Sequence, residues 1–114
     1  MYFVVRTDLK MGAGKVASQV AHAAIMLYKR AVKESPQLVR SWELRGQPKI
    51  VLKAPGGHDE LVRLEAEASA AGVVTAVVRD AGHTQVDAGT ATVLGIGPVS
   101  AEEANKVTGN LKLL

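Results

Sequence analysis

Apolar residues along this chain occur in short runs separated by longer segments with a helical repeat. The short runs, bounded by Gly, Pro or polar residues, predict four β-strands at 2–6, 49–54, 73–79 and 90–96. Apolar positions that recur every three or four residues predict helices at 15–34, 36–46, 58–71 and 101–108. The pattern therefore indicates strands that alternate with helices.

Residues at the ends of these segments support the boundaries. Ser35 and Pro36 are typical of a helix start, Gly72 of a helix end, and Ser100 with Glu103 forms a capping box. The resulting order is β-α-α-β-α-β-β-α, which favours a sheet covered on both faces. Because no helix joins the third and fourth strands, they can run antiparallel. We predict an α/β fold with three layers, α/β/α, and a mixed sheet of about four strands.

Length and composition narrow the class of protein. The chain has 114 residues, 47% of them apolar and 22% charged, which predicts one globular domain over 1–114. The absence of cysteine excludes disulfides, thiolate metal sites and a cysteine nucleophile. No apolar run reaches the roughly 18–20 residues that span a bilayer, and no signal-peptide features are present. We expect a soluble cytoplasmic protein without a membrane partner.

Positive charge is concentrated in the first half of the sequence. Residues 1–53 hold ten of the fourteen Lys and Arg but three of the eleven Asp and Glu. A basic half attracts polyanions such as nucleic acid. From charge alone, a solvated surface on which both signs mix is an equally good explanation.

The segment Gly12-Ala13-Gly14-Lys15 joins the first predicted strand to the long helix. Free N–H groups at a helix start suit a phosphate, so three interpretations compete. Leu9 and Val16 exclude a Walker A loop, because they stand at its first Gly and its Ser/Thr position. Gly12, Gly14 and Ala17 match a dinucleotide fingerprint, but the next strand lacks the acidic ribose-binding residue. Local rules alone favour a plain tight turn.

A polar stripe runs along the start of the long helix, where Lys15, Gln19 and His22 share one face. Apolar residues flank the stripe on both sides, which predicts a mostly buried helix whose polar side chains bond internally or line a cleft. Because the helix dipole disfavours a cation in the first turn, Lys15 there favours a bound anion. Taken singly, each residue is more commonly a surface lysine, a satisfied glutamine or a core histidine.

A second polar cluster, DAGHTQ at 80–85, joins the last two predicted strands. Thr90 and Thr92 follow it, two residues apart and so on one face of the last strand. Open α/β sheets bind ligands at such strand ends, although spacing alone favours an ordinary solvated turn. The three histidines lack metal-ligand spacing, and no G-x-S-x-G motif is present.

Four blocks of the sequence resemble, in the same order, the archaeal/eukaryotic-type peptidyl-tRNA hydrolases. They are RTDLKMGAGK at 6–15 with Ala17, Gln19 and 21–23; GQPKIVLK at 46–53; DAGHTQ at 80–85 with 89–93 and 95–98; and VTGNLKLL at 107–114. Together they are spread along the chain from residue 6 to residue 114, which makes the resemblance far more specific than a single motif. Two departures are Ala13, where the family usually has Lys or Arg, and Ser18, where it usually has Ala. The first removes one cation from the loop expected to face tRNA.

The resemblance implies an enzyme, usually a homodimer, that hydrolyses the ester between a peptide and the 3′-terminal ribose of tRNA. It implies no metal and no organic cofactor. The catalytic cluster that we expect on this basis comprises Lys15, Gln19, His22, Asp80, Thr90 and Thr92. The substrate-binding residues that we expect are Lys10, Gly12, Gly14, Gly82, Thr84 and Gln85.

Ester hydrolysis by water requires a base that orients the water and donors for the developing oxyanion. Asp80 is the candidate base, His22 is an alternative, and Lys15 is the candidate for stabilising an oxyanion or a phosphate. The other members of the cluster would orient substrate or water, and the basic first half would hold the tRNA backbone. Two other functions stay open, a non-catalytic RNA-binding module and, on the glycine pattern, a dinucleotide-binding oxidoreductase.

Overall fold

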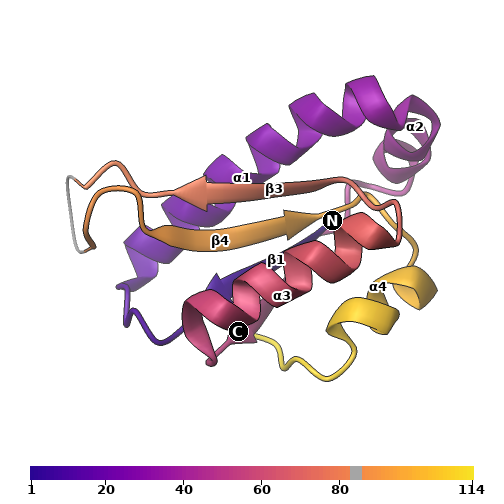
Figure 1. Cartoon of the computed structure of the whole chain (residues 1–114). Coiled ribbons are helices and arrows are strands. Elements are labelled where there is room, and N and C mark those ends of the chain that lie inside the picture. The colour runs from indigo at the N-terminus through magenta and orange to yellow at the C-terminus, as the bar shows by residue number, and fades with distance from the viewer. Residues whose placement is uncertain (83–85) are drawn as a thin grey trace.

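The computed structural model of the chain describes residues 1–82 and 86–114, which form four helices and a four-stranded sheet (Figure 1). In chain order the elements are β1 (Tyr2–Arg6), α1 (Ala13–Glu34), α2 (Pro36–Leu44), β2 (Ile50–Ala54), α3 (Gly57–Ala70), β3 (Thr75–Arg79), β4 (Ala91–Ile96) and α4 (Ala101–Thr108). Every predicted element is present, with ends that differ by at most two residues. The capping box is also confirmed in part, because Ser100 Oγ accepts the backbone N–H of Glu103 at 3.2 Å.

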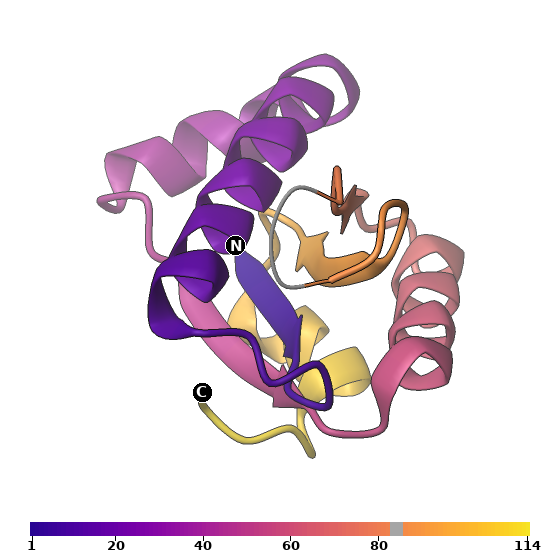
Figure 2. The ribbon, with the colours of Figure 1, turned by 90° about the vertical axis from the view of Figure 1, so that its left-hand side faces the viewer.

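The sheet is mixed, as predicted, with the strand order β2-β1-β4-β3. Strand β1 pairs with β2 in parallel, whereas β4 runs antiparallel to both of its neighbours, β1 and β3. The carboxyl ends of β1, β2 and β3 therefore lie at the same edge of the sheet as the start of β4. Figure 2 looks onto this edge, where the chain leaves β1 and enters α1. It is the edge at which open α/β sheets place their ligands.

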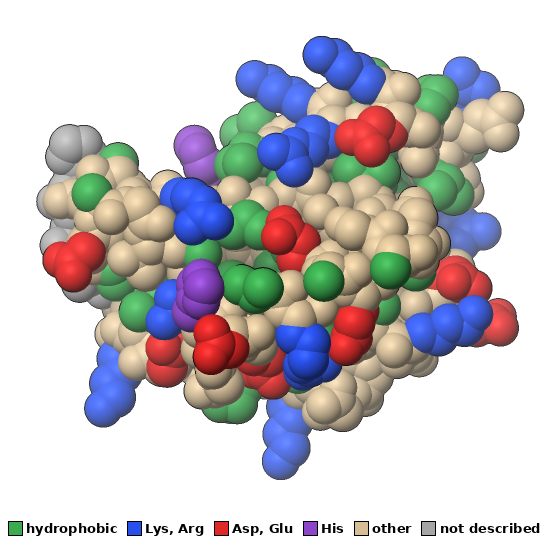
Figure 3. All heavy atoms as spheres, in the orientation of Figure 1, with side chains coloured by type: hydrophobic (Ala, Val, Ile, Leu, Met, Phe, Trp, Pro, Cys, Tyr) green, Lys and Arg blue, Asp and Glu red, His purple; other side chains and the backbone are tan. Residues whose placement is uncertain are grey.

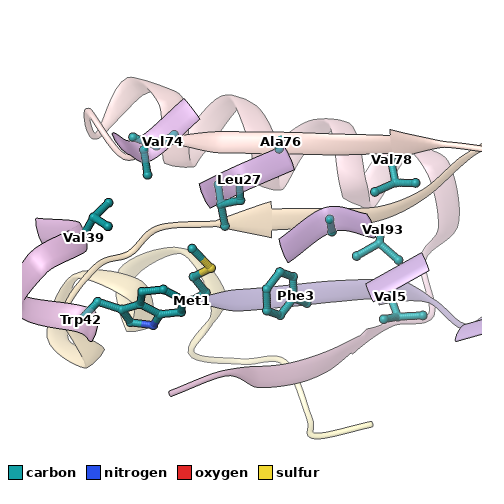
Figure 4. Packing of buried hydrophobic residues seen from close by; sticks show 12 residues of the cluster. Met1, Phe3, Val5, Leu27, Val39, Trp42, Val74, Ala76, Val78 and Val93 are labelled. Atoms are coloured by element: carbon teal, nitrogen blue, oxygen red, sulfur yellow. The ribbon is translucent and has the colours of Figure 1, made fainter. Parts of the chain in front are cut away.

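Side chains that alternate along the strands divide the core into two parts. Phe3 and Val5 of β1 face α1 and α2, where they pack with Leu27 and Trp42 (Figure 4). Tyr2 and Val4 of β1 pack instead with the apolar side chains of α3 and α4. Each face of the sheet is thus covered by a helical layer, which confirms the predicted three-layer arrangement.

A close approach between α1 and β4 fixes the helix over the sheet. A Cβ at Gly95 of β4 would lie 3.2 Å from Cδ2 of Leu27, a side chain that is fully buried. The small residue at position 95 therefore lets α1 pack tightly against the strand. This contact also sets where the first turn of α1 lies at the carboxyl edge of the sheet.

The prediction that α1 is mostly buried was wrong for one of its apolar flanks. Ala17 and Ala21 are exposed, and Ile25 is 59% exposed. The physical reason is that α1 packs mainly on β1, β4 and β3, which leaves its flank toward β2 open. Apolar spacing identified a helix, but it could not show how far the helical layer reaches across the sheet.

The last residues of the chain cover the outer edge of β2. The N–H of Lys53 donates to the carbonyl of Lys112 at 2.8 Å, and the N–H of Leu114 donates to the carbonyl of Val51 at 3.0 Å. Leu113 forms an antiparallel bridge with Leu52. A covered edge of this kind blocks pairing with another strand.

An ion pair fixes the loop between β1 and α1. Arg6 donates from Nε and Nη2 to the two carboxylate oxygens of Asp8, at 3.1 and 2.7 Å, and from Nη1 to the carbonyl of Ala91 at 3.1 Å. The hydrogen bond from Arg6 is the main cause that lowers the pKa of Asp8 below its ordinary value. The loop that leads to the first turn of α1 is thereby attached to the start of β4.

We expect Asp8→Asn to destabilise the protein by up to about 1 kcal/mol at neutral pH, as measured by urea unfolding. A carboxyl with a lowered folded pKa contributes stability that is fully present above its unfolded pKa and is lost as pH falls through its folded pKa. The difference between wild type and variant should therefore shrink as pH falls below the ordinary aspartate pKa of about 3.9. A difference that stays constant with pH would mean that packing, not charge, is what the substitution removes.

Candidate active site

A buried ion pair joins α1 to the end of β3. Nζ of Lys15, in the first turn of α1, donates to Oδ1 of Asp80, which directly follows β3. The two side chains are only 10% and 3% exposed. The fold thus brings together two of the predicted catalytic residues that are 65 positions apart in the sequence.

The backbone around Asp80 holds its carboxylate in place. Oδ2 accepts the N–H of Gly82 at 2.7 Å, while the Asp80 N–H donates to the carbonyl of Thr90 at 2.8 Å and the Asp80 carbonyl accepts from Gly89 at 2.7 Å. Gly82 has φ +83°, and a Cβ there would lie 2.7 Å from Cβ of Ala88. Position 82 therefore needs glycine both for its conformation and for space. The predicted residue Gly82 acts on the site through its backbone N–H.

The sequence favours a bound anion at Lys15, and in the structure the chain itself supplies the negative charge. The first turn of α1 carries no acidic residue, yet Lys15 lies there as a nearly buried cation. A cation at this end of a helix is disfavoured unless a negative charge is close. The Asp80 carboxylate provides that charge, so the lysine is held at the carboxyl edge of the sheet.

A second buried contact joins α1 to β4. The hydroxyl of Thr92 donates to Oε1 of Gln19 at 2.6 Å, and both residues are buried. Val78 pairs with Val93 and Arg79 with Ala91, so the register skips Thr92 and leaves it in a β-bulge. A bulge changes the direction of a side chain, and here it turns Thr92 toward α1.

The amide nitrogen of Gln19 is available at this site. Its oxygen accepts from Thr92, so Nε2 is left with two N–H groups to donate. Nε2 has no partner among residues 1–82 and 86–114. In that same part of the chain, every fully buried side-chain polar atom has a partner, so solvent reaches Nε2. Gln19 can therefore donate to a bound molecule while Thr92 fixes its orientation.

We expect Thr92→Val to lower the free energy of unfolding by about 1–3 kcal/mol, because it leaves the buried Oε1 of Gln19 without a donor. Thr108→Val is a matched control, since Thr108 is equally buried but donates at 3.0 Å to a carbonyl of its own helix. That carbonyl keeps its helical partner, so the control should lose less stability. Urea unfolding of both variants measures this, and equal losses would contradict the role given to Gln19.

The other predicted residues lie around these two contacts or outside the described structure. Thr90 is partly buried and contributes its carbonyl to Asp80. Lys10 is exposed in the loop before α1 with φ +53°, Gly12 caps the start of α1, and Gly14 lies exposed in its first turn. Thr84 and Gln85, together with His83, lie outside the described residues.

His22 is not brought into contact with the buried pair. It is exposed on α1 and makes no hydrogen bond or ion pair with any residue of 1–82 or 86–114. Seven positions of helix separate it from Lys15, which corresponds to about 10 Å along the axis. Its position on the same face as Lys15 is as predicted, but the structure gives it no link to Asp80.

Arg6 is a residue that sequence reasoning did not assign to the site. Its side chain joins the loop before α1 to the start of β4, and so it positions two segments that carry site residues. The signal available in the sequence was the pair of opposite charges at positions 6 and 8. The bulge at Thr92 left no comparable signal.

The arrangement is suited to polar chemistry with water. A carboxylate can orient a water molecule and take its proton, and an ammonium group with an amide can stabilise negative charge that develops on an oxygen. Asp80, Lys15 and Gln19 supply these groups at the carboxyl edge of the sheet. The fold and the site thus define a small α/β domain with a paired lysine and aspartate beside a buried glutamine.

Comparison with known proteins identifies the family. The family model described as "Peptidyl-tRNA hydrolase PTH2" matches residues 1–114. The chain is 51% identical over 113 residues to "Peptidyl-tRNA hydrolase 2, mitochondrial" of Mus musculus, which covers 99% of this chain and 62% of that protein. It is 47% identical over 111 residues to "Peptidyl-tRNA hydrolase" of Methanothermobacter thermautotrophicus, which covers 97% of this chain and 96% of that protein.

This chain belongs to the PTH2 family of peptidyl-tRNA hydrolases. It is also 50% identical over 113 residues to the human protein "Peptidyl-tRNA hydrolase 2, mitochondrial" and spans 63% of that protein's length. The chain thus covers less than two thirds of the mammalian relatives and nearly all of the archaeal one. No helix in the described part of the chain is long and apolar enough to cross a membrane.

Proposed function

We propose that this protein hydrolyses the ester bond between a peptide and the 3′-terminal ribose of tRNA, which frees the tRNA for reuse. The family match over residues 1–114 and the name of the archaeal relative support this reaction. The structural observation that carries the proposal is the buried pair of Lys15 and Asp80 beside Gln19. Such a set of groups is what hydrolysis of an ester by water requires.

In the proposed reaction, Asp80 orients a water molecule and accepts a proton from it as the water oxygen bonds to the ester carbonyl carbon. The carbonyl oxygen becomes negative, and Lys15 donates to it from Nζ. The tetrahedral intermediate then breaks its bond to the ribose oxygen, which takes the proton back from Asp80. Gln19, oriented by Thr92, donates to the substrate, and Thr90 lies beside Asp80 to help orient the water.

Two features of the structure favour Asp80 over His22 as the base. Asp80 lies in the buried cluster with Lys15, whereas His22 is exposed about 10 Å away along α1. A base must be within hydrogen-bond reach of the water that it activates, directly or through one further water. We therefore assign the base to Asp80 and give His22 no proton-transfer role.

The reaction as proposed uses only water and side chains, so we expect it to proceed in the presence of EDTA. The test is release of free tRNA from N-acetylaminoacyl-tRNA by the purified protein with EDTA present. Multiple turnovers would support the proposal. Salt-sensitive tRNA binding without turnover would instead indicate a non-catalytic RNA-binding module. Loss of both from a folded sample would contradict the proposed substrate.

We also propose that two copies pair through an open apolar groove. The groove has a volume of about 880 Å³ and lies between α1 and β2, lined by Ala17, Ala21 and Ile25 on one side and Val51 and Leu114 on the other. Exposed apolar side chains that gather in one groove are a common feature of protein interfaces. We expect Ile25→Glu to shift a dimer to monomers in sedimentation experiments. Val62→Glu changes a side chain of α3 that is also about half exposed, and it should leave the dimer intact.

A cytoplasmic location is part of the proposal, since the substrate that we propose arises during translation. The mammalian relatives carry the word mitochondrial in their names, so location is to be tested directly. Fractionation of cells that produce the tagged protein would place it with soluble cytoplasmic markers. Recovery with an organelle fraction would contradict this part.

A further inference from the structure

The face of α1 that carries Lys15 continues along the whole helix. His22, Lys29 and Lys33 lie 7, 14 and 18 positions after Lys15. At 3.6 residues per turn, these spacings are close to two, four and five whole turns, so the four side chains project from one side of the helix. We call His22, Lys29 and Lys33 the α1 stripe. All three are exposed.

The lysines of the α1 stripe are not used by the fold. Neither Lys29 nor Lys33 makes a hydrogen bond or an ion pair with any described residue. Arg30, the next residue along, does have a structural use, since it donates to the carbonyl of Thr75 at 2.7 Å. The stripe lysines are therefore available to a partner, whereas Arg30 is occupied.

Negative charge is scarce around the α1 stripe. Helix α1 holds four Lys and Arg and a single acidic residue, Glu34, at its last position. On the neighbouring helix α2, the carboxylate of Glu43 is paired with the hydroxyl of Tyr28 at 3.4 Å and with neither lysine of the α1 stripe. Figure 3 shows Lys and Arg side chains gathered along the upper edge of the molecule, over α1 and α2, with an acidic side chain among them. This edge is suited to a polyanion.

The length of the stripe matches a nucleic acid that starts at the candidate active site. With a rise of about 1.5 Å per residue, Lys29 lies about 21 Å and Lys33 about 27 Å from Lys15 along the helix axis. Stacked nucleotides advance by roughly 3.4 Å per phosphate, so these distances correspond to about six to eight nucleotides. That is long enough to pass the unpaired 3′ end of a tRNA and reach its paired acceptor stem.

We propose that the α1 stripe binds the sugar-phosphate backbone of the tRNA acceptor stem while the 3′ ester lies at Lys15 and Asp80. This inference rests on the proposed function. Phosphate contacts of this kind position a nucleic acid without reading its sequence. The stripe also explains His22, which contacts the backbone near the unpaired end. None of the three stripe residues lines the apolar groove, so two copies can pair there and leave the stripe open.

The test compares two substrates that carry the same ester. One is N-acetylaminoacyl-tRNA, and the other is the same N-acetylaminoacyl group on a trinucleotide that is too short to reach Lys29. For Lys29→Gln combined with Lys33→Gln, we expect KM for the tRNA to rise at least about fivefold with kcat unchanged. Hydrolysis of the trinucleotide ester should stay at the wild-type rate. Loss of two phosphate contacts should also lower the slope of log KM against log salt by about 1.5.

Two further variants make the test specific. Arg63→Gln combined with Lys106→Gln removes the same number of charges from exposed ion pairs on α3 and α4, in the opposite helical layer. This control should leave KM for both substrates and the salt slope unchanged. His22→Ala should raise KM for tRNA and keep kcat, as expected for a binding residue rather than a base.

The outcomes separate this proposal from the one on which it rests. If the wild-type protein hydrolyses neither substrate, the proposed function fails. If it hydrolyses both and the double lysine variant keeps the wild-type KM and salt slope for tRNA, the acceptor stem does not lie on α1. Equal losses on tRNA and trinucleotide would also overturn the proposal, because they would show damage to the site itself. If the control variant on α3 and α4 raised KM for tRNA by the same factor, the effect would come from the net charge of the protein and not from the α1 stripe, and the proposal would fail.

Discussion

Replacement of Asp80 with asparagine is expected to lower kcat for hydrolysis of N-acetylaminoacyl-tRNA by roughly 10²–10⁴-fold. Asparagine has the size of aspartate, and its oxygen can still accept the N–H of Gly82. It cannot take a proton from water, and it offers Lys15 no negative charge. The loss should therefore appear in the rate constant of the chemical step, measured in single-turnover reactions, and in kcat more than in KM.

Asp87→Asn is the matched control for this prediction. Asp87 lies on the same connection between β3 and β4, is exposed, and contributes its backbone carbonyl to Thr90 at 3.2 Å. The same loss of charge there should leave kcat near the wild-type value. If Asp80→Asn retained full kcat, Asp80 would be a structural partner of Lys15 and the base would have to be another group.

Stability must be measured alongside activity, because removing one partner of a buried ion pair costs about 3–5 kcal/mol. The combination of Asp80→Asn with Lys15→Met replaces both charges, so no unpaired buried charge remains. We expect this double variant to recover stability in urea unfolding relative to Asp80→Asn, yet to stay as inactive. Recovery of kcat with stability would show that Asp80→Asn had acted through the fold.

The order and type of the elements could be predicted because each depends on neighbouring residues. Runs of β-branched residues, a three-to-four residue repeat, and caps such as Ser100 with Glu103 are local signals. The open flank of α1 at Ala17 and Ala21 could not be predicted in the same way. It depends on the width of the sheet relative to one helix, which is a property of the assembled layers.

The candidate site shows the same division between local and long-range information. The shared face of Lys15 and Gln19 follows from helical spacing, and the polar loop at Asp80 was visible from its composition. Their partners follow from tertiary structure. Asp80 reaches Lys15 only because β3 ends beside the start of α1, and Thr92 reaches Gln19 through a bulge. The resemblance to a family grouped these residues together, but it did not show which one contacts which.

Replacement of Lys15 with alanine is expected to lower kcat by roughly 10²–10³-fold, the size of effect seen when one donor to a developing oxyanion is removed. In the structure, Nζ is held on Asp80 and lies at the edge of the sheet where the ester is proposed to bind. Lys15→Arg keeps the charge, but its planar fork places the donors differently from a single ammonium group. We expect its kcat to lie between those of wild type and Lys15→Ala.

The two roles left open for Lys15 by its sequence position predict different kinetics. A lysine that binds a phosphate contributes equally before and during the chemical step, so its loss raises KM and leaves kcat unchanged. A lysine that stabilises an oxyanion contributes only in the transition state, so its loss lowers kcat. Lys10→Ala removes an exposed lysine of the loop before α1, and we expect it to raise KM and leave kcat unchanged. It therefore serves as the comparison for a lysine that only binds. If Lys15→Ala behaved like Lys10→Ala, the oxyanion role would have to be given to Gln19. If instead its loss lies in kcat, and adding Asp80→Asn lowers kcat no further, the buried pair acts as one catalytic unit.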